Sequence, residues 1–310
     1  MLWDAWDIER FYRDTIVAED RLASREVVAD GPLFFTLGSR YEIGRHSTLT
    51  QDMTFYSRSR RIDFTTRVDW QETHTLLKVG FPVDVHADSC RHEIQFGHLV
   101  RPSHTNTSYD QARFETCAHK WVDVSENGYG VAILNDCKYG HDALDKMISI
   151  SLLRSCVLPD EKADRGAHEF TYALLPHSGD FSVEQVVHEA YALNVPLACI
   201  PVARAKGEID AVRFCTVSNP NVVVEAVKKA EDGDAFVIRA YEAGNSRGPV
   251  ELGFAFPVAS VQECNLVERQ VADVPVKHNS VTFTIQPFEI KTFLVSPHRV
   301  SMSTQQQNWP

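Results

Sequence analysis

The sequence contains no Cys-x-x-Cys pair and no apolar run long enough to span a membrane, and each absence excludes a class of protein. Its seven cysteines are odd in number and widely separated, which favours reduced thiols in the cytosol over a disulfide framework. Acidic residues stand near the first methionine, where a secretory signal has basic and then apolar ones. We therefore expect a soluble, cytoplasmic protein with no membrane partner.

Basic residues are also scarce relative to acidic ones. The chain has 31 Lys and Arg against 42 Asp and Glu, a formal net charge of -11, so a nucleic acid backbone would repel it. The chain has no Gly-x-Ser-x-Gly elbow, no Gly-rich phosphate loop and no His-Glu-x-x-His helix. General motifs therefore leave the function open.

β-strand patterns fill most of the 310 residues. In 61–70, Ile62, Phe64 and Val68 fall on one face and Arg61, Asp63, Thr65 and Arg67 on the other, which is typical of a half-solvated antiparallel strand. Similar runs, rich in β-branched and aromatic residues, occupy 32–43, 47–56, 74–85, 129–136, 146–155 and 168–177. We expect a mainly β fold.

Two segments depart from the strand pattern. Ser182 and Gln185 resemble a capping box that opens a short helix, which "NVPL" would end. Near the start, Trp3, Trp6 and Phe11 among acidic residues predict a short amphipathic helix or a docking arm whose aromatic side chains need a cover.

A second series of strands begins after the basic, Gly-containing segment 200–210. Six or seven strands in about ninety residues, separated by turns such as "EDGDA", predict a small antiparallel sandwich. We therefore expect a first domain over 1–203, a smaller sandwich over 204–297, and a disordered polar tail over 298–310.

The densest histidine region holds His86, Asp88, Cys90 and His92 at alternate positions. In one strand this spacing would put all four side chains on the same face, where three of them have the chemistry to ligate a metal. The alternative is a solvated strand face or loop with a thiol nearby, because the spacing matches no known zinc motif.

A polar loop and the strand expected after it supply donors and aromatic rings suited to sugar recognition. Asp110 and Glu115 within it are also a candidate acid and base pair for glycoside hydrolysis, although most carboxylates are simply solvated surface groups. The loop contributes His104, Asn106, Tyr109 and Asp110, and the strand Arg113, Glu115, His119 and Trp121.

Polar side chains crowd around Gly140 where the 129–136 strand should turn. Asn135, Asp136, Lys138, Tyr139 and His141 all lie within "ILNDCKYGHD". Asn, Asp and Gly suit an ordinary turn, because they bond their own backbone and tolerate left-handed dihedrals. The density of polar groups also fits a ligand surface held on a rigid sheet.

Several long, word-like blocks follow one another in the sequence. They are "SRRIDFTTRVDWQETHTLLKVGFPVDV", "IQFGHLVRPSHTNTSYDQARFETCAHKWVDVSENGYGVAILNDCKYGHD", "SLLRS", "PDEKADRGAHEFTYALLPHSG", "HEAYALNVPL" and "PFEIKTFLV". Over about residues 3–296 the chain resembles, in the same order, the C-terminal portion of α-mannosidases of glycoside hydrolase family 38, particularly its cytosolic, vacuolar and bacterial branch.

This resemblance implies a large galactose-mutarotase-like supersandwich followed by a smaller β-sandwich. Family enzymes hydrolyse terminal α-mannosides with retention, using zinc and an aspartate nucleophile. Those groups belong to an N-terminal catalytic barrel and adjoining helices, and no residue here matches them. The resemblance thus implies no catalytic residue and no cofactor in this chain. It implies two partners, the catalytic barrel of the same enzyme and a mannose-containing oligosaccharide.

In such enzymes the first β domain packs on the barrel and lends side chains to the rim of the sugar pocket. The resemblance implies that role for Asn135, Asp136, Lys138 and Tyr139, which otherwise hold the turn or bond to the barrel. Relatives often have an arginine a few positions later, near Leu144 here, so a charge-assisted contact at that point is not expected.

Two other functions are kept as alternatives. The β domains alone would form a carbohydrate-binding module if a groove of Tyr, Trp and Asn held a glycan. A mutarotase-like enzyme would instead use a His and Glu pair for acid–base ring opening. In the leading interpretation, an uncovered aromatic face also allows self-association.

Overall fold

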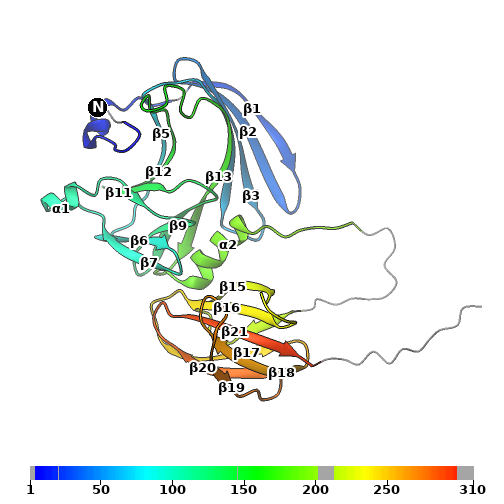
Figure 1. Cartoon of the computed structure of the whole chain (residues 1–310). Coiled ribbons are helices and arrows are strands. Elements are labelled where there is room, and N and C mark those ends of the chain that lie inside the picture. The colour runs from blue at the N-terminus through cyan, green and yellow to red at the C-terminus, as the bar shows by residue number, and fades with distance from the viewer. Residues whose placement is uncertain (1–3, 20, 145, 202–212, 299–310) are drawn as a thin grey trace, which may run out of the picture. The chain divides into compact units, whose positions relative to one another are not determined.

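A computed structural model describes residues 4–19, 21–144, 146–201 and 213–298 (Figure 1). The chain divides into two compact units, Met1–Ala198 and Cys199–Pro310, called here the large and the small unit. The boundary predicted after residue 203 falls in a stretch outside the described residues and stays a prediction. So does the disordered tail, of which only His298 is described.

The large unit is built on a nine-stranded antiparallel sheet. Its neighbouring strands come mostly from consecutive hairpins, because short turns join successive strands along the chain. In order across the sheet they are β1 (Leu22–Asp30), β2 (Phe34–Ile43), β3 (Ser47–Tyr56), β4 (Ile62–Trp70), β13 (Gly166–Ser178), β10 (Tyr129–Asn135), β9 (Trp121–Ser125), β6 (Ser89–Ile94) and β7 (Gly97–Pro102).

A second sheet of the large unit has four strands. They are, in order, β5 (Leu76–Pro82), β12 (Met147–Arg154), β11 (Gly140–Leu144) and β8 (Thr116–Cys117). One hydrophobic core joins the two sheets, with Trp70, Ile133 and Phe170 from the first and Ile148 and Ile150 from the second. Because β10 belongs to one sheet and β11 to the other, the turn between them carries the chain across the sandwich.

Strand β4 follows the predicted alternation with one exception. Phe64, Thr66, Val68 and Trp70 are buried, and Arg67 is exposed. Asp63, predicted on the solvated face, is buried, because Arg61 pairs with it at 2.7 Å and the Tyr56 hydroxyl donates to it. A paired carboxylate tolerates burial.

Short helical segments complete the large unit. The predicted helix is confirmed, and one half of the capping box is present: the Ser182 hydroxyl accepts a hydrogen bond from the Gln185 amide at the start of a helical stretch that ends at Asn194. The Gln185 side chain instead donates to the Ser178 carbonyl and the Ser182 hydroxyl. Near the start of the chain, Trp6 and Phe11 are exposed, and Trp3 lies outside the described residues. The segments are η1 (Arg10–Thr15), α1 (Ser108–Gln111), η2 (Val183–Val187) and α2 (His188–Asn194).

The small unit is a separate antiparallel β-sandwich. Its core packs Ile238, Leu252, Val281 and Phe293 between the sheets. One sheet has the order β14 (Cys215–Val217), β17 (Gly248–Phe254) and β20 (Ser280–Ile285). The other has the order β15 (Val222–Lys229), β16 (Phe236–Glu242), β21 (Ile290–Pro297), β18 (Val258–Cys264) and β19 (Gln270–Val274).

The predicted fold class is confirmed: the chain is mainly β, with a large antiparallel assembly followed by a smaller sandwich. Among the described residues, no helix combines the length and the apolar character needed to cross a bilayer.

Candidate functional site

The turn between β10 and β11 is held by the side chain of Asn135, which is fully buried. Its Nδ2 donates to the carbonyl oxygen of His119 at 2.6 Å, and its Oδ1 accepts from the amide of Lys138 at 2.7 Å. From α2, Asn194 Nδ2 donates to the carbonyl oxygen of Asn135 at 3.0 Å. These bonds fix the backbone of the turn on two neighbouring segments.

Asp136 fastens the same turn to β13. Its Oδ2 accepts from the amide of Thr171 at 2.9 Å, and its own amide donates back to the Thr171 carbonyl at 3.1 Å. The other carboxylate oxygen, Oδ1, is buried and accepts no hydrogen bond from a described residue. Burial and the Asp136 carboxylate raise the pKa of the neighbouring Cys137 thiol to about 11, so that thiol is not a nucleophile at neutral pH.

Lys138 and Tyr139 form the outer part of the turn. The Lys138 ammonium lies 4.6 Å from the centre of the Phe170 ring, a cation–π contact that restricts the side chain. Tyr139 is 51% exposed, and its ring centre lies 5.3 Å from that of His119. Of the four predicted residues, Lys138 and Tyr139 have side chains near the surface. The other two, Asn135 and Asp136, hydrogen-bond the backbone instead.

His141 completes the polar cluster of the sequence but lies inside the protein. It is fully buried, and burial, together with the nearby Lys78 ammonium, lowers its pKa to about 3. The imidazole is therefore uncharged at neutral pH. The polar residues of "NDCKYGH" thus divide into Asn135 and Asp136, which hold the turn, the buried His141, and an outer pair, Lys138 and Tyr139.

A buried ion network lies beside the turn on the four-stranded sheet. Lys78 Nζ is 2.7 Å from Glu115 Oε2 and 2.9 Å from Asp142 Oδ2. Burial opposes the charge of this ammonium, but the two carboxylates outweigh it and raise the pKa of Lys78. From η1, Arg13 reaches Asp142 at 3.1 Å and the Tyr12 hydroxyl approaches Glu115 at 3.4 Å. Sequence reasoning missed this network, because its members come from segments far apart in the chain.

The predicted carboxylate pair is divided between two environments. Glu115 belongs to the Lys78 network and also accepts from the Ser151 hydroxyl. Asp110 instead closes a capping box on α1, where its Oδ2 accepts from the Thr107 hydroxyl at 2.7 Å. Each carboxylate therefore has a structural partner of its own.

The four residues at alternate positions do not share one strand face, so the metal alternative lacks its geometry. Strand β6 begins at Ser89, so His86 and Asp88 precede it and are exposed, while Cys90 and His92 are buried on its inner face. Cys90 Sγ and His92 Nε2 lie 3.1 Å apart. Within the described ranges, no three His, Cys, Asp or Glu side chains are grouped to hold a metal ion.

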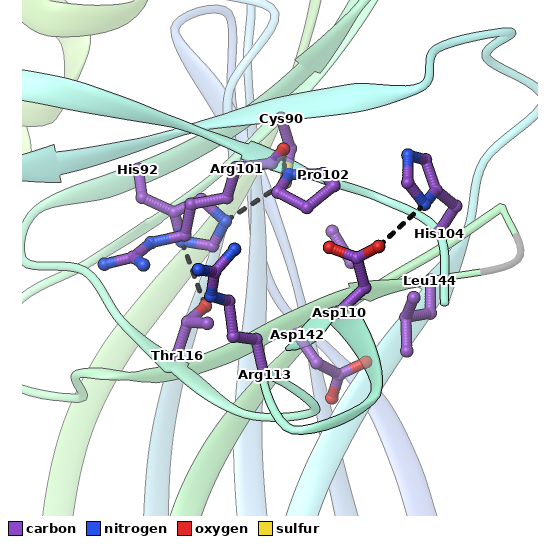
Figure 2. Close-up of a pocket in the computed structure, with 11 residues that line it drawn as sticks. Cys90, His92, Arg101, Pro102, His104, Asp110, Arg113, Thr116, Asp142 and Leu144 are labelled. Atoms are coloured by element: carbon purple, nitrogen blue, oxygen red, sulfur yellow. Dashed lines mark hydrogen bonds and ion pairs between the residues drawn. The ribbon is translucent and has the colours of Figure 1, made fainter. Parts of the chain in front are cut away.

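A small cavity opens beside the Asp142 end of this network (Figure 2). Its volume is about 20 Å³. The walls come from β6, the end of β7, the following loop with α1, β8 and β11. They comprise Cys90, His92, Arg101, Pro102, His104, Asp110, Arg113, Thr116, Asp142, Ala143 and Leu144.

Two family profiles match the chain in order. The first, described as the glycosyl hydrolases family 38 C-terminal domain, covers residues 1–162. The second, the glycosyl hydrolases family 38 C-terminal beta sandwich domain, covers residues 221–293. The chain belongs to glycosyl hydrolase family 38. It corresponds to the C-terminal part of the family's proteins, as the sequence blocks predicted.

Family 38 relatives extend along nearly the whole chain. Alpha-mannosidase 2C1 of Homo sapiens is 39% identical over 303 residues, which are 95% of this chain and 29% of that protein. Alpha-mannosidase G of Dictyostelium discoideum is 38% identical over 305 residues, or 94% of this chain and 28% of its own length. The chain thus spans less than a third of the curated relatives it matches.

A solved structure shows the same fold. The crystal structure of an alpha-mannosidase from Enterococcus faecalis V583 matches with a TM-score of 0.74 and 18% identity, covering 87% of this chain and 35% of that one. Family 38 membership fits zinc in full-length enzymes. The described residues of this chain offer no ligand set for it.

Proposed function

We propose that this chain is the non-catalytic C-terminal β portion of an α-mannosidase that hydrolyses terminal α-D-mannosides with retention. The observation that carries the proposal is identity of 38 to 39% with proteins named alpha-mannosidase along about 95% of the chain. The remaining length of such an enzyme would supply the nucleophile and the zinc site. The carbohydrate-binding module and the mutarotase-like enzyme are not favoured by these comparisons.

The chain's role in catalysis is to complete the sugar pocket. It packs on the catalytic barrel of the same enzyme, and the turn between β10 and β11 contacts a mannose-containing oligosaccharide. The inner side chains Asn135 and Asp136 fix the backbone through bonds within the chain. A prebuilt turn lowers the entropy cost of holding a ligand.

The outer side chains make the direct contacts. The Lys138 ammonium donates to sugar hydroxyls from its place over Phe170, and the Tyr139 hydroxyl donates or accepts in a fixed direction. Asp136 serves the site through its hold on the backbone of the turn, because its other oxygen, Oδ1, is buried. All four predicted residues thus serve the site, two of them chiefly by holding it. Cytoplasmic location and self-association stay predictions.

The test uses a joined enzyme, defined as human alpha-mannosidase 2C1 with its matching C-terminal segment replaced by this chain. We expect Tyr139→Phe to lower kcat/KM on an aryl α-mannoside about 2- to 10-fold, the effect of one neutral hydrogen bond. Lys138→Met removes a charged donor and should lower it roughly 10- to 100-fold. Tyr129→Phe, at the other end of β10 and 38% exposed, is the matched control.

Thermal unfolding of the same variants separates contact from support. Because Tyr139 and Lys138 lie at the outside of the turn, both variants should unfold within about 0.5 kcal/mol of the parent. If both variants keep the parent's kinetics and the parent's stability, the proposal that the turn contacts the sugar is wrong.

A further inference from the structure

The small cavity beside Asp142 has donors and acceptors facing one opening. The Arg113 guanidinium and the His104 imidazole line it together with the Asp110 and Asp142 carboxylates (Figure 2). Arg113 forms no ion pair with a described residue, so its donors are available at the cavity. The polar loop noted in the sequence thus places two of its side chains, His104 and Asp110, at a concave site.

Both carboxylates are fixed by other partners. Hydrogen bonds from Thr107, helped by the charges of His104 and Arg113, hold the pKa of Asp110 below its usual value, so it is an ionised acceptor at neutral pH. Asp142 is held by Arg13 at 3.1 Å and Lys78 at 2.9 Å. The cavity therefore exists before a ligand enters.

The mixture of charges selects the class of ligand. An anion in the cavity would meet the Asp110 and Asp142 carboxylates, and a cation would meet the Arg101 and Arg113 guanidiniums, so both are disfavoured. Burial keeps the neighbouring Cys90 and His92 uncharged, with a pKa of about 12 for the thiol and about 3 for the imidazole. A neutral hydroxyl, which donates and accepts at once, suits such a lining.

The size agrees with a single polar group. A cavity of about 20 Å³ holds little more than one water-sized group. A hydroxyl or a hydroxymethyl fits, and Pro102, Ala143 and Leu144 supply apolar wall for its carbon. A whole sugar ring does not fit, so the rest of the ligand must lie outside the opening.

The cavity lies near the turn between β10 and β11. Asp142 follows Tyr139 by three residues, which bounds the separation of their Cα atoms at about 11 Å. Strand β8 joins the two places, since Cys117 pairs with Gly140 and Thr116, which lines the cavity, pairs with His141. One glycan is long enough to reach both.

We propose that this cavity is a subsite for one hydroxyl or hydroxymethyl group of a neutral glycan, on a sugar next to the one that contacts Tyr139. The inference rests on the proposed function for the identity of the glycan. It adds Arg113, His104 and Asp110 to the residues that contact substrate. Arg113 contributes donors, Asp110 is an acceptor, and His104 fixes Asp110 from 3.6 Å.

The test measures binding to the 310-residue chain by amide NMR. Methyl α-D-mannoside and α-mannobiose are titrated separately, with inorganic phosphate as a third arm. We expect saturable shifts at Asp110, Arg113 and Leu144 with the sugars, at a dissociation constant on the order of 10 mM or tighter. Saturation by phosphate alone, or no saturable shift with either sugar, would overturn the proposal.

Variants assign the binding to the cavity. Arg113→Met keeps the aliphatic stem and should weaken sugar binding about tenfold, the loss expected for a charged donor. Arg40→Met, an exposed arginine on β2, should leave it unchanged. Both should keep the parent's thermal unfolding; equal affinity of the two variants would contradict the assignment.

Failure here is separable from failure of the proposed function. Binding to the chain alone does not depend on turnover by the joined enzyme. If the cavity binds sugar but Tyr139→Phe leaves the kinetics unchanged, the subsite proposal is supported and the proposed role of the turn is contradicted. If Tyr139→Phe lowers kcat/KM but the cavity binds no sugar, the role of the turn is supported and the subsite proposal is contradicted.

Discussion

The two units of the chain bury different kinds of side chain. Among the described residues, the buried polar and charged side chains of the small unit are Glu242 and Thr292. The large unit buries a long series, including Asp63, Glu72, Glu93, Asp123, Asn135, His141, Asp142 and His177. The small unit is stabilised mainly by an apolar core, whereas the large unit also depends on paired polar groups.

The difference indicates where function lies. Burying a polar or charged group costs free energy unless it is hydrogen-bonded or paired, and each one in the large unit requires specific partners. Asn135, Asp136 and Asp142 use such partners to fix a turn and a cavity wall. Among its described residues the small unit has one such cluster, in which buried Glu242 accepts from the amides of Gly244 and Phe288 and from the Ser246 hydroxyl. Its core is otherwise mainly apolar, which fits a scaffold.

Removing apolar volume from the small unit should have the largest effect on stability. Phe293 is fully buried and its ring centre lies 4.9 Å from that of Phe283. We expect Phe293→Ala to lower the free energy of unfolding by about 3 to 5 kcal/mol, measured by urea denaturation. Val271→Ala, at a 67% exposed position of the same unit, is the control and should change it by less than about 0.5 kcal/mol.

Each unit has an asparagine whose side chain holds a turn, and the two can be compared for the effect of burial on stability. Asn135 is buried, while Asn265 is exposed and its Oδ1 accepts from the amides of Val267 and Arg269. Asn135→Ala leaves buried partners unpaired and should cost about 2 to 3 kcal/mol, against about 1 kcal/mol or less for Asn265→Ala. Similar losses in calorimetry would mean that burial does not distinguish the units.

A smaller effect with a pH signature is expected at Glu72 of the large unit. Burial alone would raise its pKa, but the His46 and Arg45 amides and the Ser47 hydroxyl donate to the carboxylate and lower it. A lowered folded pKa stabilises the protein above the unfolded value of about 4.3, and this contribution is lost as pH falls below it.

We therefore expect Glu72→Gln to cost about 1 to 2 kcal/mol at pH 7, with the difference from the parent shrinking below about pH 4. Denaturant titrations across this range measure it. Glu26→Gln on the exposed strand β1 is the control and should show no such trend. A difference that is constant with pH would contradict the role given to the ionised carboxylate.

The periodicity of the sequence predicted most strands of both units but not the edge strand β1. In Leu22–Asp30 every residue but one is exposed, so burial imposes no alternation on its polar sequence. The helix at Val183–Asn194 was predicted because a capping box is a local signal. Strand β11 was missed because its polar residues, His141 and Asp142, are buried, and Asp142 pairs with Arg13 and Lys78, which lie far away in sequence.

The candidate site could be predicted only in part for the same reason. The polar turn stood out because its residues are contiguous. The shared face of His86, Asp88, Cys90 and His92 does not form, because β6 begins at Ser89, where its pairing with β7 begins. The cavity joins Arg101, Asp110 and Asp142 from three segments, and no spacing rule in the sequence connects them.

The most direct test of the account is turnover of an aryl α-mannoside by the purified 310-residue chain, compared with the joined enzyme under the same conditions. The account predicts hydrolysis by the joined enzyme and none by the chain alone. Hydrolysis by the chain alone, at a rate comparable to that of the joined enzyme, would contradict it.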